Sequence, residues 1–412
     1  MMLTRIEKFF TFFALLSASL ICGEYAMTRP ASNALFLTAF SAKAYPYIWL
    51  ATVPVNLFVV YLYNRFLPKI GPFRMLMALA LLSMTINTVT GFFYPVLPEI
   101  SFLQYIWKDI YILLMLKQLW SMIHSTIPSA RAASLYGCIY GAGTVGAIAG
   151  SLIPSFLASA LGSEKILCLT TPAYLLLILT YTMAYRRSAI QGDTFEKDLS
   201  EDPSPKEAVS LIRKTPILMA VLLLVIFMQA SVALMEYRFN AHLELNIIEK
   251  DVRTAYYGQI AGIINGFSLL FQFIGALLVV KTLGLKRSHF LVPLLLGLSV
   301  LSSLAFPTFA MMTCSYIFLK AIDFSLFGVI REMLYVPLQL DAKYRAKAII
   351  DVFAYRTSKA VVSLGLLLMQ VLAGGYLLKI TGYISCIVLM AWLATVMIFF
   401  REKEAFTAKW TV

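Results

Sequence analysis

The sequence is poor in the residues that soluble proteins and metal sites need. Only 13% of its 412 residues are charged, and it contains three His and five Cys, whereas about a quarter of a soluble domain is charged. Every Cys lies in an apolar stretch, and no two have the spacing of a metal or redox site. The sequence also shows no paired arrangement of a nucleophile and a base. These absences exclude a disulfide-rich scaffold and a metal centre, and we expect neither a cofactor nor an enzymatic activity.

Hydrophobic residues, in contrast, make up 60% of the chain, which is more than the core of a soluble protein holds. They gather in runs long enough to cross a bilayer as helices, which takes about 20 residues each. The runs predict twelve spans, at residues 9–37, 44–66, 73–95, 102–128, 136–160, 166–185, 216–240, 254–280, 289–306, 308–337, 348–377 and 380–400. We therefore predict an all-α, polytopic membrane protein.

A long polar segment, residues 186–215, separates six predicted spans from the other six. It predicts an N-terminal six-helix bundle at 1–185, a cytoplasmic central loop at 186–215 and a C-terminal six-helix bundle at 216–412. Two six-helix halves joined by a polar loop resemble the layout of the major facilitator transporters, whose halves are parallel repeats.

The net charge of +13 would suggest a nucleic-acid partner for a soluble protein. In a membrane protein, Lys and Arg instead concentrate in the cytoplasmic loops. With the N-terminus inside, the inner loops and the termini hold 21 of the 34 cations. The outer loops hold six: Lys43, Lys108, Lys165, Lys250, Arg253 and Lys379. We predict that both termini are cytoplasmic, that the chain lies in the inner cell membrane, and that nucleic acid is not its partner.

When the charges nearer the span ends are counted with the loops, twelve charges remain inside the predicted spans. The cations are Arg29, Lys117, Arg238, Lys320, Arg331, Arg356 and Lys359, and the acids are Glu24, Glu236, Asp323, Glu332 and Asp351. A charge at the centre of a span costs roughly 2.5–3.5 kcal/mol, so these side chains must be paired, hydrated in a cavity, or both. The interior of spans three, six, nine and twelve carries no charge. In the major facilitator layout those four spans face lipid, and spans one, four, seven and ten line a central cavity.

The surplus of cations inside the spans points to an anionic substrate. Even if all five acids pair with cations across helices, which is the simplest structural explanation of these charges, two cations are left over. A cavity with surplus positive charge holds an anion, and Lys and Arg are natural ligands of phosphate oxygens. We predict three groups of site residues: substrate ligands Arg29, Lys117, Arg238, Lys320 and Asp323; gate ion pairs among Arg331, Glu332, Asp351, Arg356 and Lys359; and coupling acids Glu24 and Glu236.

Helical periodicity adds two expectations about these side chains. Lys320, Asp323 and Arg331 are spaced i, i+3 and i+11, so a regular α-helix would place them on one stripe. Glu236 and Arg238 are two residues apart, so they point to opposite sides of their helix.

Two segments resemble the ATP/ADP translocase family, the nucleotide transporters of plastids and obligate intracellular bacteria. The first runs from Arg331-Glu332 through Tyr335-Val336-Pro337-Leu338 and the Lys-rich loop 343–347 to Asp351, Arg356 and Lys359; the second runs from Trp107-Lys108-Asp109 to Leu119-Trp120. Lys117 stands where the family pattern has an acid. The resemblance implies exchange of a nucleotide, of the ATP and ADP type, by alternating access.

Other interpretations remain open at this stage. The first alternative is a proton-coupled major facilitator carrier of another organic anion or a peptide, in which Glu24 and Asp323 take up protons. A more remote alternative is a non-transporting membrane enzyme or scaffold. The run Gly141-Ala142-Gly143-Thr144-Val145-Gly146 matches a dinucleotide fingerprint in spelling, but it lies inside span five. There the i, i+4 pairs Gly137/Gly141 and Gly146/Gly150 favour close helix packing. We expect a monomer whose partners are the lipid bilayer and a small anion.

Overall fold

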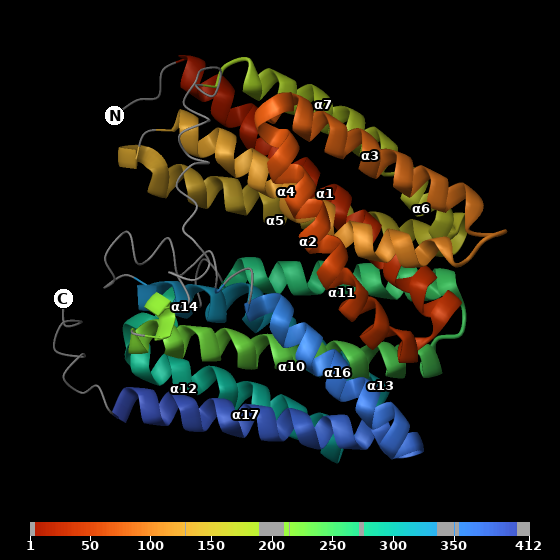
Figure 1. Cartoon of the computed structure of the whole chain (residues 1–412), viewed down its shortest axis with the longest axis vertical. Coiled ribbons are helices and arrows are strands. Elements are labelled where there is room, and N and C mark those ends of the chain that lie inside the picture. Colours follow the sequence, from red (N-terminus) through yellow and green to blue (C-terminus); the bar gives the residue numbers. More distant parts are fainter. Residues whose placement is uncertain are drawn as a thin grey trace. The chain divides into compact units, whose positions relative to one another are not determined.

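Long helices account for nearly all of the described chain, because backbone groups inside a bilayer find hydrogen-bond partners most readily within a helix. The computed structural model describes residues 5–127, 129–188, 210–213, 215–271, 276–335, 350 and 354–401. Within these residues the elements are helical throughout (Figure 1). The prediction of an all-α fold is confirmed.

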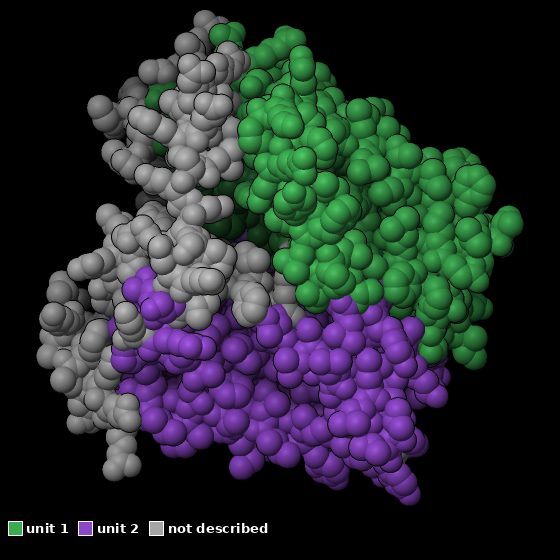
Figure 2. All heavy atoms as spheres, viewed as in Figure 1, with its two compact units in different colours: residues 1–41, 51–201, 247–266 green, residues 42–50, 202–246, 267–412 purple. Residues whose placement is uncertain are grey.

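The described residues form two compact units, coloured separately in Figure 2. The first unit consists of Met1–Ser41, Ala51–Glu201 and Ile247–Gly266, and the second of Ala42–Leu50, Asp202–Asn246 and Phe267–Val412. Two helices therefore change unit along their length. The predicted bundles 1–185 and 216–412, with the loop 186–215, stay a prediction.

The first unit is built around its N-terminal helix. Its helices are α1 (Arg5–Phe40), the main part of α2 (Tyr45–Ile70), α3 (Pro72–Phe93), α4 (Ile100–Thr126), α5 (Ser129–Leu161), α6 (Ser163–Cys168), α7 (Thr171–Tyr185) and most of α11 (Lys250–Leu270). α1 packs against α5, α7 and α4, so it is the central element of this unit (Figure 1).

The second unit is built around α10 (Pro216–Asn246), which packs against α17, α16 and α13. Its other helices are α12 (Ala276–Ala305), α13 (Phe309–Ile322), the π-helix Asp323–Phe327, α14 (Gly328–Tyr335), α16 (Tyr355–Ala373) and α17 (Leu377–Arg401). Most of the side chains of α10 are buried. The central helix of each unit thus carries predicted site residues, α1 in the first and α10 in the second.

Nine helices in the described part of the chain are long and apolar enough to cross a membrane. The predicted fourth, eighth and eleventh spans are helices too, namely α4, α11 and α16. They are not among the nine because α4 and α11 carry several charged and amide side chains, and because the apolar stretch of α16 is short, Thr357–Leu372. The chain is a polytopic, all-helical membrane protein.

Two helices depart from the regular geometry that the sequence suggested. Gly284 has φ 74° and ψ 164°, which ends the helical path within α12 and divides it into two parts. Only glycine adopts such a backbone at no steric cost. The predicted spans 254–280 and 289–306 accordingly lie on either side of this residue. In the tenth span, Asp323–Phe327 form a π-helix between α13 and α14, and π turns often mark functional sites.

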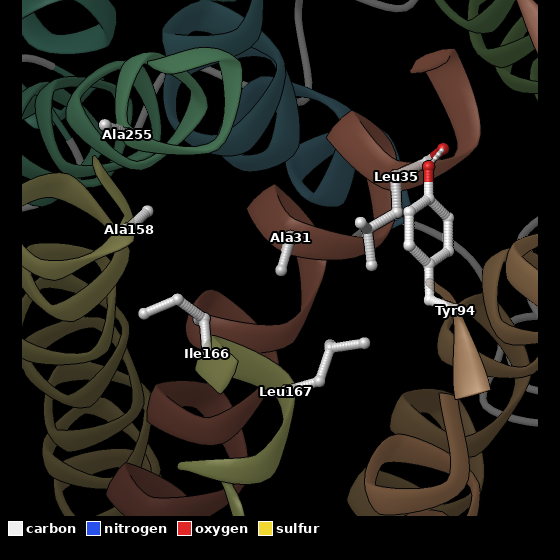
Figure 3. Close-up of a cluster of buried hydrophobic side chains, with 7 residues drawn as sticks. All are labelled: Ala31, Leu35, Tyr94, Ala158, Ile166, Leu167 and Ala255. Atoms are coloured by element: carbon white, nitrogen blue, oxygen red, sulfur yellow. Dashed lines mark hydrogen bonds between the residues drawn. The ribbon is translucent and has the colours of Figure 1, made fainter. Parts of the chain in front are cut away.

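A cluster of buried apolar side chains in the first unit joins α1 to the C-terminal ends of α3 and α5, to α6 and to α11. It contains Ala31, Leu35, Tyr94, Ala158, Ile166, Leu167 and Ala255 (Figure 3). The Tyr94 hydroxyl donates to the backbone carbonyl of Leu35 at 3.0 Å. The hydroxyl is the one polar group of the Tyr94 side chain, and this hydrogen bond gives it a partner inside the apolar cluster.

Glycines let α1 and α5 touch backbone to backbone. A Cβ atom placed on Gly150 would lie 2.0 Å from the carbonyl oxygen of Gly23, and one on Gly146 would lie 2.1 Å from that of Ser19. Side chains at these positions would push the helices apart. The predicted packing role is confirmed for Gly146 and Gly150, while Gly137 has no neighbour within 4 Å of such an atom.

Candidate functional site

The main charge cluster of the second unit, which we call the lysine pair site, consists of Glu236, Lys320 and Lys359. These residues come from α10, α13 and α16. The Nζ atoms of Lys320 and Lys359 lie 3.7 Å and 3.9 Å from the same oxygen, Oε2 of Glu236. Glu236 is 6% exposed and Lys320 is 4% exposed. The helices thus bring two ammonium groups to one buried carboxylate.

The lysine pair site carries one more positive charge than negative. Because both nitrogens lie within 4 Å of one oxygen, they are less than about 8 Å apart, where two like charges repel by roughly 2 kcal/mol at an effective dielectric constant of about 20. At the same dielectric constant each ammonium is attracted to the carboxylate by about 4 kcal/mol. Glu236 therefore stabilises a pair of cations that would otherwise repel each other.

Aromatic rings surround the two lysines. The Lys359 Nζ lies 4.5 Å from the centre of the Trp49 ring, and the Lys320 Nζ lies 5.6 Å and 6.0 Å from the rings of Phe324 and Tyr316. Ring faces stabilise a nearby cation. They are also the surfaces on which nucleic-acid bases stack, so the site combines groups suited to phosphate with groups suited to a base.

Asp323 begins the π-helix three residues after Lys320 and is half-buried. Its carboxylate accepts a hydrogen bond from the side-chain amide of Gln229 on α10. The predicted stripe through Lys320, Asp323 and Arg331 assumed a regular α-helix. A π turn holds more residues than an α turn, so Arg331 is rotated away from the position that α periodicity gives it.

The predicted gate residues are only partly described. Arg331 contacts its neighbour Glu332 at 3.3 Å, and Lys359 contacts Glu236 rather than another predicted gate residue. Asp351 lies outside the described residues, and the side chain of Arg356 is likewise outside them. The gate therefore stays a prediction.

Arg238 lies on the other side of α10 from the lysine pair site. Its guanidinium donates to the Ser303 hydroxyl at 3.2 Å on α12, and it packs close to Gly382 of α17. Because Glu236 contacts α13 and α16 instead, the expectation that Glu236 and Arg238 point to opposite sides is confirmed. The predicted role of Arg238 as a substrate ligand stays a prediction.

In the first unit, Glu24 is the centre of a buried polar network on α1. Its carboxylate is 2% exposed and accepts hydrogen bonds from Thr28, Asn87 and Tyr111, at 2.5 Å, 3.2 Å and 2.8 Å. Asn87 also receives a hydrogen bond from Gln104 at 2.7 Å. The ion pairs identified among the described residues do not include Glu24. Hydroxyl and amide donors, rather than a cation, hold this carboxylate.

The two predicted cations of the first unit are less deeply placed. Arg29 is half-buried on α1. Lys117 is exposed on α4, where its Nζ lies 3.5 Å from the Asn64 amide oxygen and 5.3 Å from the Tyr63 ring centre. Their role as substrate ligands stays a prediction.

A buried ion pair in the same helix had been assigned wrongly from the sequence. Lys108 is counted above with the outer loops, although the predicted span 102–128 contains it. It lies inside α4, is 2% exposed, and contacts the half-buried Asp109 at 2.8 Å. The adjacent opposite charges in an otherwise apolar helix were the signal that could have revealed the pair. Together they add no net charge to the first unit.

Sequence reasoning also missed a polar cluster at the start of α11. Lys250 contacts Glu164 at 2.6 Å, and Asp251 accepts hydrogen bonds from the backbone and the hydroxyl of Ser163 at 2.7 Å and 2.6 Å. Partial burial would raise the pKa of Asp251, but the bonds from Ser163 and Lys250 outweigh it and the pKa is lowered. Burial would lower the pKa of Lys250, but Glu164 and Asp251 outweigh it and the pKa is raised. No sequence signal joins two loops so far apart in the chain.

Comparison with known proteins adds a family and a fold. The TLC ATP/ADP transporter family matches residues 308–402, which confirms the resemblance over this segment. The segment contains Lys320, Asp323, Arg331 and Lys359. No curated protein sequence matches the chain.

Several solved transporters share the fold at low sequence identity. The nucleoside transporter NupG has a TM-score of 0.64 and 13% identity, over 97% of this chain and 100% of its own. The xylose transporter XylE from E. coli, in an inward-open conformation, has a TM-score of 0.63 and 15% identity, over 95% and 94%. A bacterial homologue of the iron transporter ferroportin has a TM-score of 0.66 and 13% identity, over 97% and 99%.

These likenesses agree with the layout that the apolar spans predicted. The family and the proteins of similar fold are transporters rather than enzymes. The chain has the fold of the major facilitator transporters, and its residues 308–402 match the ATP/ADP transporter family.

Proposed function

We propose that the protein is a secondary transporter that moves nucleotides across the membrane by alternating access, through exchange of ATP and ADP or through nucleotide uptake. One observation carries the proposal: the segment that matches the ATP/ADP transporter family contributes both lysines of the lysine pair site. The family likeness thus covers the two lysines of this buried cluster, which lie on α13 and α16.

The chemistry of the site supports a phosphate-bearing substrate. Two ammonium groups that converge on one point offer several charge-assisted hydrogen bonds to phosphate oxygens. Trp49, Phe324 and Tyr316 add ring faces near the same lysines. An inorganic ion would use the lysines alone, whereas a nucleotide would use both the lysines and the rings.

The proposal assigns Lys320 and Lys359 to the phosphate groups, with Arg29 and Lys117 as further cations from the first unit. Arg331, Glu332, Asp351 and Arg356 would form and break ion pairs as the protein changes conformation. The excess of Lys and Arg in the predicted inner loops supports an orientation with both termini in the cytoplasm. We propose that the protein works as a monomer in the inner cell membrane.

The experiment that tests this function is uptake into liposomes that contain the purified protein. Liposomes preloaded with ADP should take up labelled ATP faster than empty liposomes. A panel of other nucleotides inside and outside then defines the preferred base. If no internal nucleotide stimulates uptake and no nucleotide enters empty liposomes, the nucleotide transport proposal is wrong.

A second candidate function is proton-coupled transport of another organic anion or a peptide. The buried carboxylate of Glu24, held by neutral donors, favours it because such a group can accept a proton without leaving a cation unpaired. Uptake that follows an imposed pH gradient, and that requires no nucleotide inside, would select this alternative.

A further inference from the structure

The position of Glu236 is unusual because one of its oxygens contacts both lysines of the site. Lys320 and Lys359 approach Oε2 from different helices, at 3.7 Å and 3.9 Å. In a chain of two separate ion pairs, each lysine would meet its own acid. Here one carboxylate oxygen occupies the point between two ammonium groups, which is the place that an anionic ligand of both would take.

The two contacts are longer than hydrogen bonds. Charge-assisted bonds between an ammonium and an oxyanion are usually about 2.7–2.9 Å long, and neither lysine comes that close to Glu236. Glu236 is fixed to α10, and its Oε2 lies near both lysines without reaching hydrogen-bond distance from either. A free phosphate group is not so constrained, and as a dianion it would offer each lysine a full opposite charge.

We propose that Glu236 is a built-in counter-anion, which holds Lys320 and Lys359 when the site is empty and is displaced from them by the phosphate groups of the substrate. The proposal rests on the proposed function and adds a role for one residue. Glu236 keeps the lysine pair compensated and in place within the membrane. It also competes with the substrate, so it weakens the binding of anions but has no such effect on an uncharged ligand.

The test is equilibrium binding to the purified full-length protein and to Glu236→Gln, which keeps the shape of the side chain and removes its charge. The probes are ADP, inorganic pyrophosphate and the uncharged nucleoside adenosine. Because Glu236→Gln removes the competing carboxylate, the Kd values for ADP and pyrophosphate should fall on the order of tenfold. The Kd for adenosine should not change.

The matched control is Glu99→Gln, which makes the same chemical change at an exposed residue before α4. It changes the net charge equally, so it should leave all three Kd values unchanged. If Glu236→Gln does not fold, Glu236→Asp serves instead: it withdraws the carboxylate by one methylene and should tighten ADP and pyrophosphate by a smaller factor.

The outcomes separate this proposal from the function on which it rests. If Glu236→Gln binds pyrophosphate more tightly than the wild-type protein does, and neither protein binds nucleotides, the role of Glu236 as a counter-anion is supported. The same result contradicts nucleotide transport. If Glu236→Gln binds ADP and pyrophosphate no more tightly than the wild-type protein does, the counter-anion proposal is wrong. It is also wrong if the variant binds adenosine more tightly by the same factor. Absence of any anion binding to the wild-type and variant proteins also overturns it.

Discussion

Replacement of Gly150 by alanine tests the packing on which the first unit depends. The added Cβ would lie 2.0 Å from the carbonyl oxygen of Gly23, on the facing helix α1. Carbon and oxygen atoms in close contact between helices are normally about 3.3–3.6 Å apart. The two helices would therefore have to separate by roughly 1.3–1.6 Å along a contact that Gly146 also shares.

The magnitude follows from two opposing effects. Overpacking of a tightly fitted interface destabilises by about 1–3 kcal/mol, while alanine is the better helix former by about 0.5–1 kcal/mol. Gly150→Ala should therefore lower the free energy of unfolding by up to about 2.5 kcal/mol. Gly137→Ala is the matched control, because Gly137 lies on the same helix, is exposed, and has no neighbour within 4 Å of a Cβ atom.

The assay is thermal unfolding of both variants in the same detergent, followed by intrinsic tryptophan fluorescence. Gly150→Ala should unfold a few degrees below the wild-type protein, and Gly137→Ala should unfold at the same temperature or slightly above it. If Gly150→Ala is as stable as Gly137→Ala, the backbone contact between α1 and α5 does not exist in the membrane protein and the reasoning fails.

Three further predictions concern charged side chains. Lys359→Gln removes one of the two ammonium groups at the lysine pair site, so the Kd for ADP should rise about tenfold or more, and an unchanged Kd in a binding titration would contradict the assignment. Glu24→Gln leaves hydroxyl and amide donors without their charged acceptor, which should destabilise by about 1–3 kcal/mol; thermal unfolding measures this, and equal stability would show that the network is not held by the charge. Asp251→Asn should destabilise the protein at pH 7, because the folded pKa of Asp251 is lowered, so its contribution is present above the unfolded pKa of about 3.9 and is lost as the pH falls through the folded pKa. Unfolding temperatures of the two proteins should converge below about pH 4, and a constant difference across the acid range would rule this out.

Much of the architecture could be predicted from the sequence, because a bilayer permits few alternatives. Apolar runs of sufficient length specify helices, and the polar segment 186–215 suggested how they are grouped. The likeness to major facilitator transporters agrees with that layout. Hydropathy alone could not give the π-helix at Asp323–Phe327, since its geometry depends on packing around it.

The site was predicted less completely. Periodicity placed Glu236 and Arg238 on opposite sides of α10, which the contacts confirm. It could not tell which helix each side chain faces. That Arg238 contacts Ser303 on α12 could not be read from the sequence. The shared carboxylate of Glu236 was also beyond the sequence, since three helices have to be placed before it can be recognised.

The buried pair of Lys108 and Asp109 shows a different limit. The count of Lys and Arg places Lys108 in an outer loop, because a single charge is less costly in water than inside a span. The structure buries it beside Asp109 and over the ring of Tyr105, at 3.7 Å from the ring centre. Neutralisation by a neighbouring residue and a ring face makes burial possible, and a count of single charges cannot detect it.

The central claim is that the lysine pair site carries nucleotides across the membrane. The most direct test is the initial rate of labelled ATP uptake into liposomes preloaded with ADP, for the wild-type protein and for Lys320→Gln. Internal ADP should stimulate uptake by the wild-type protein, and the variant, inserted at the same level, should lose most of this uptake. Equal rates in the two proteins, or no uptake of any nucleotide by the wild-type protein, would contradict it.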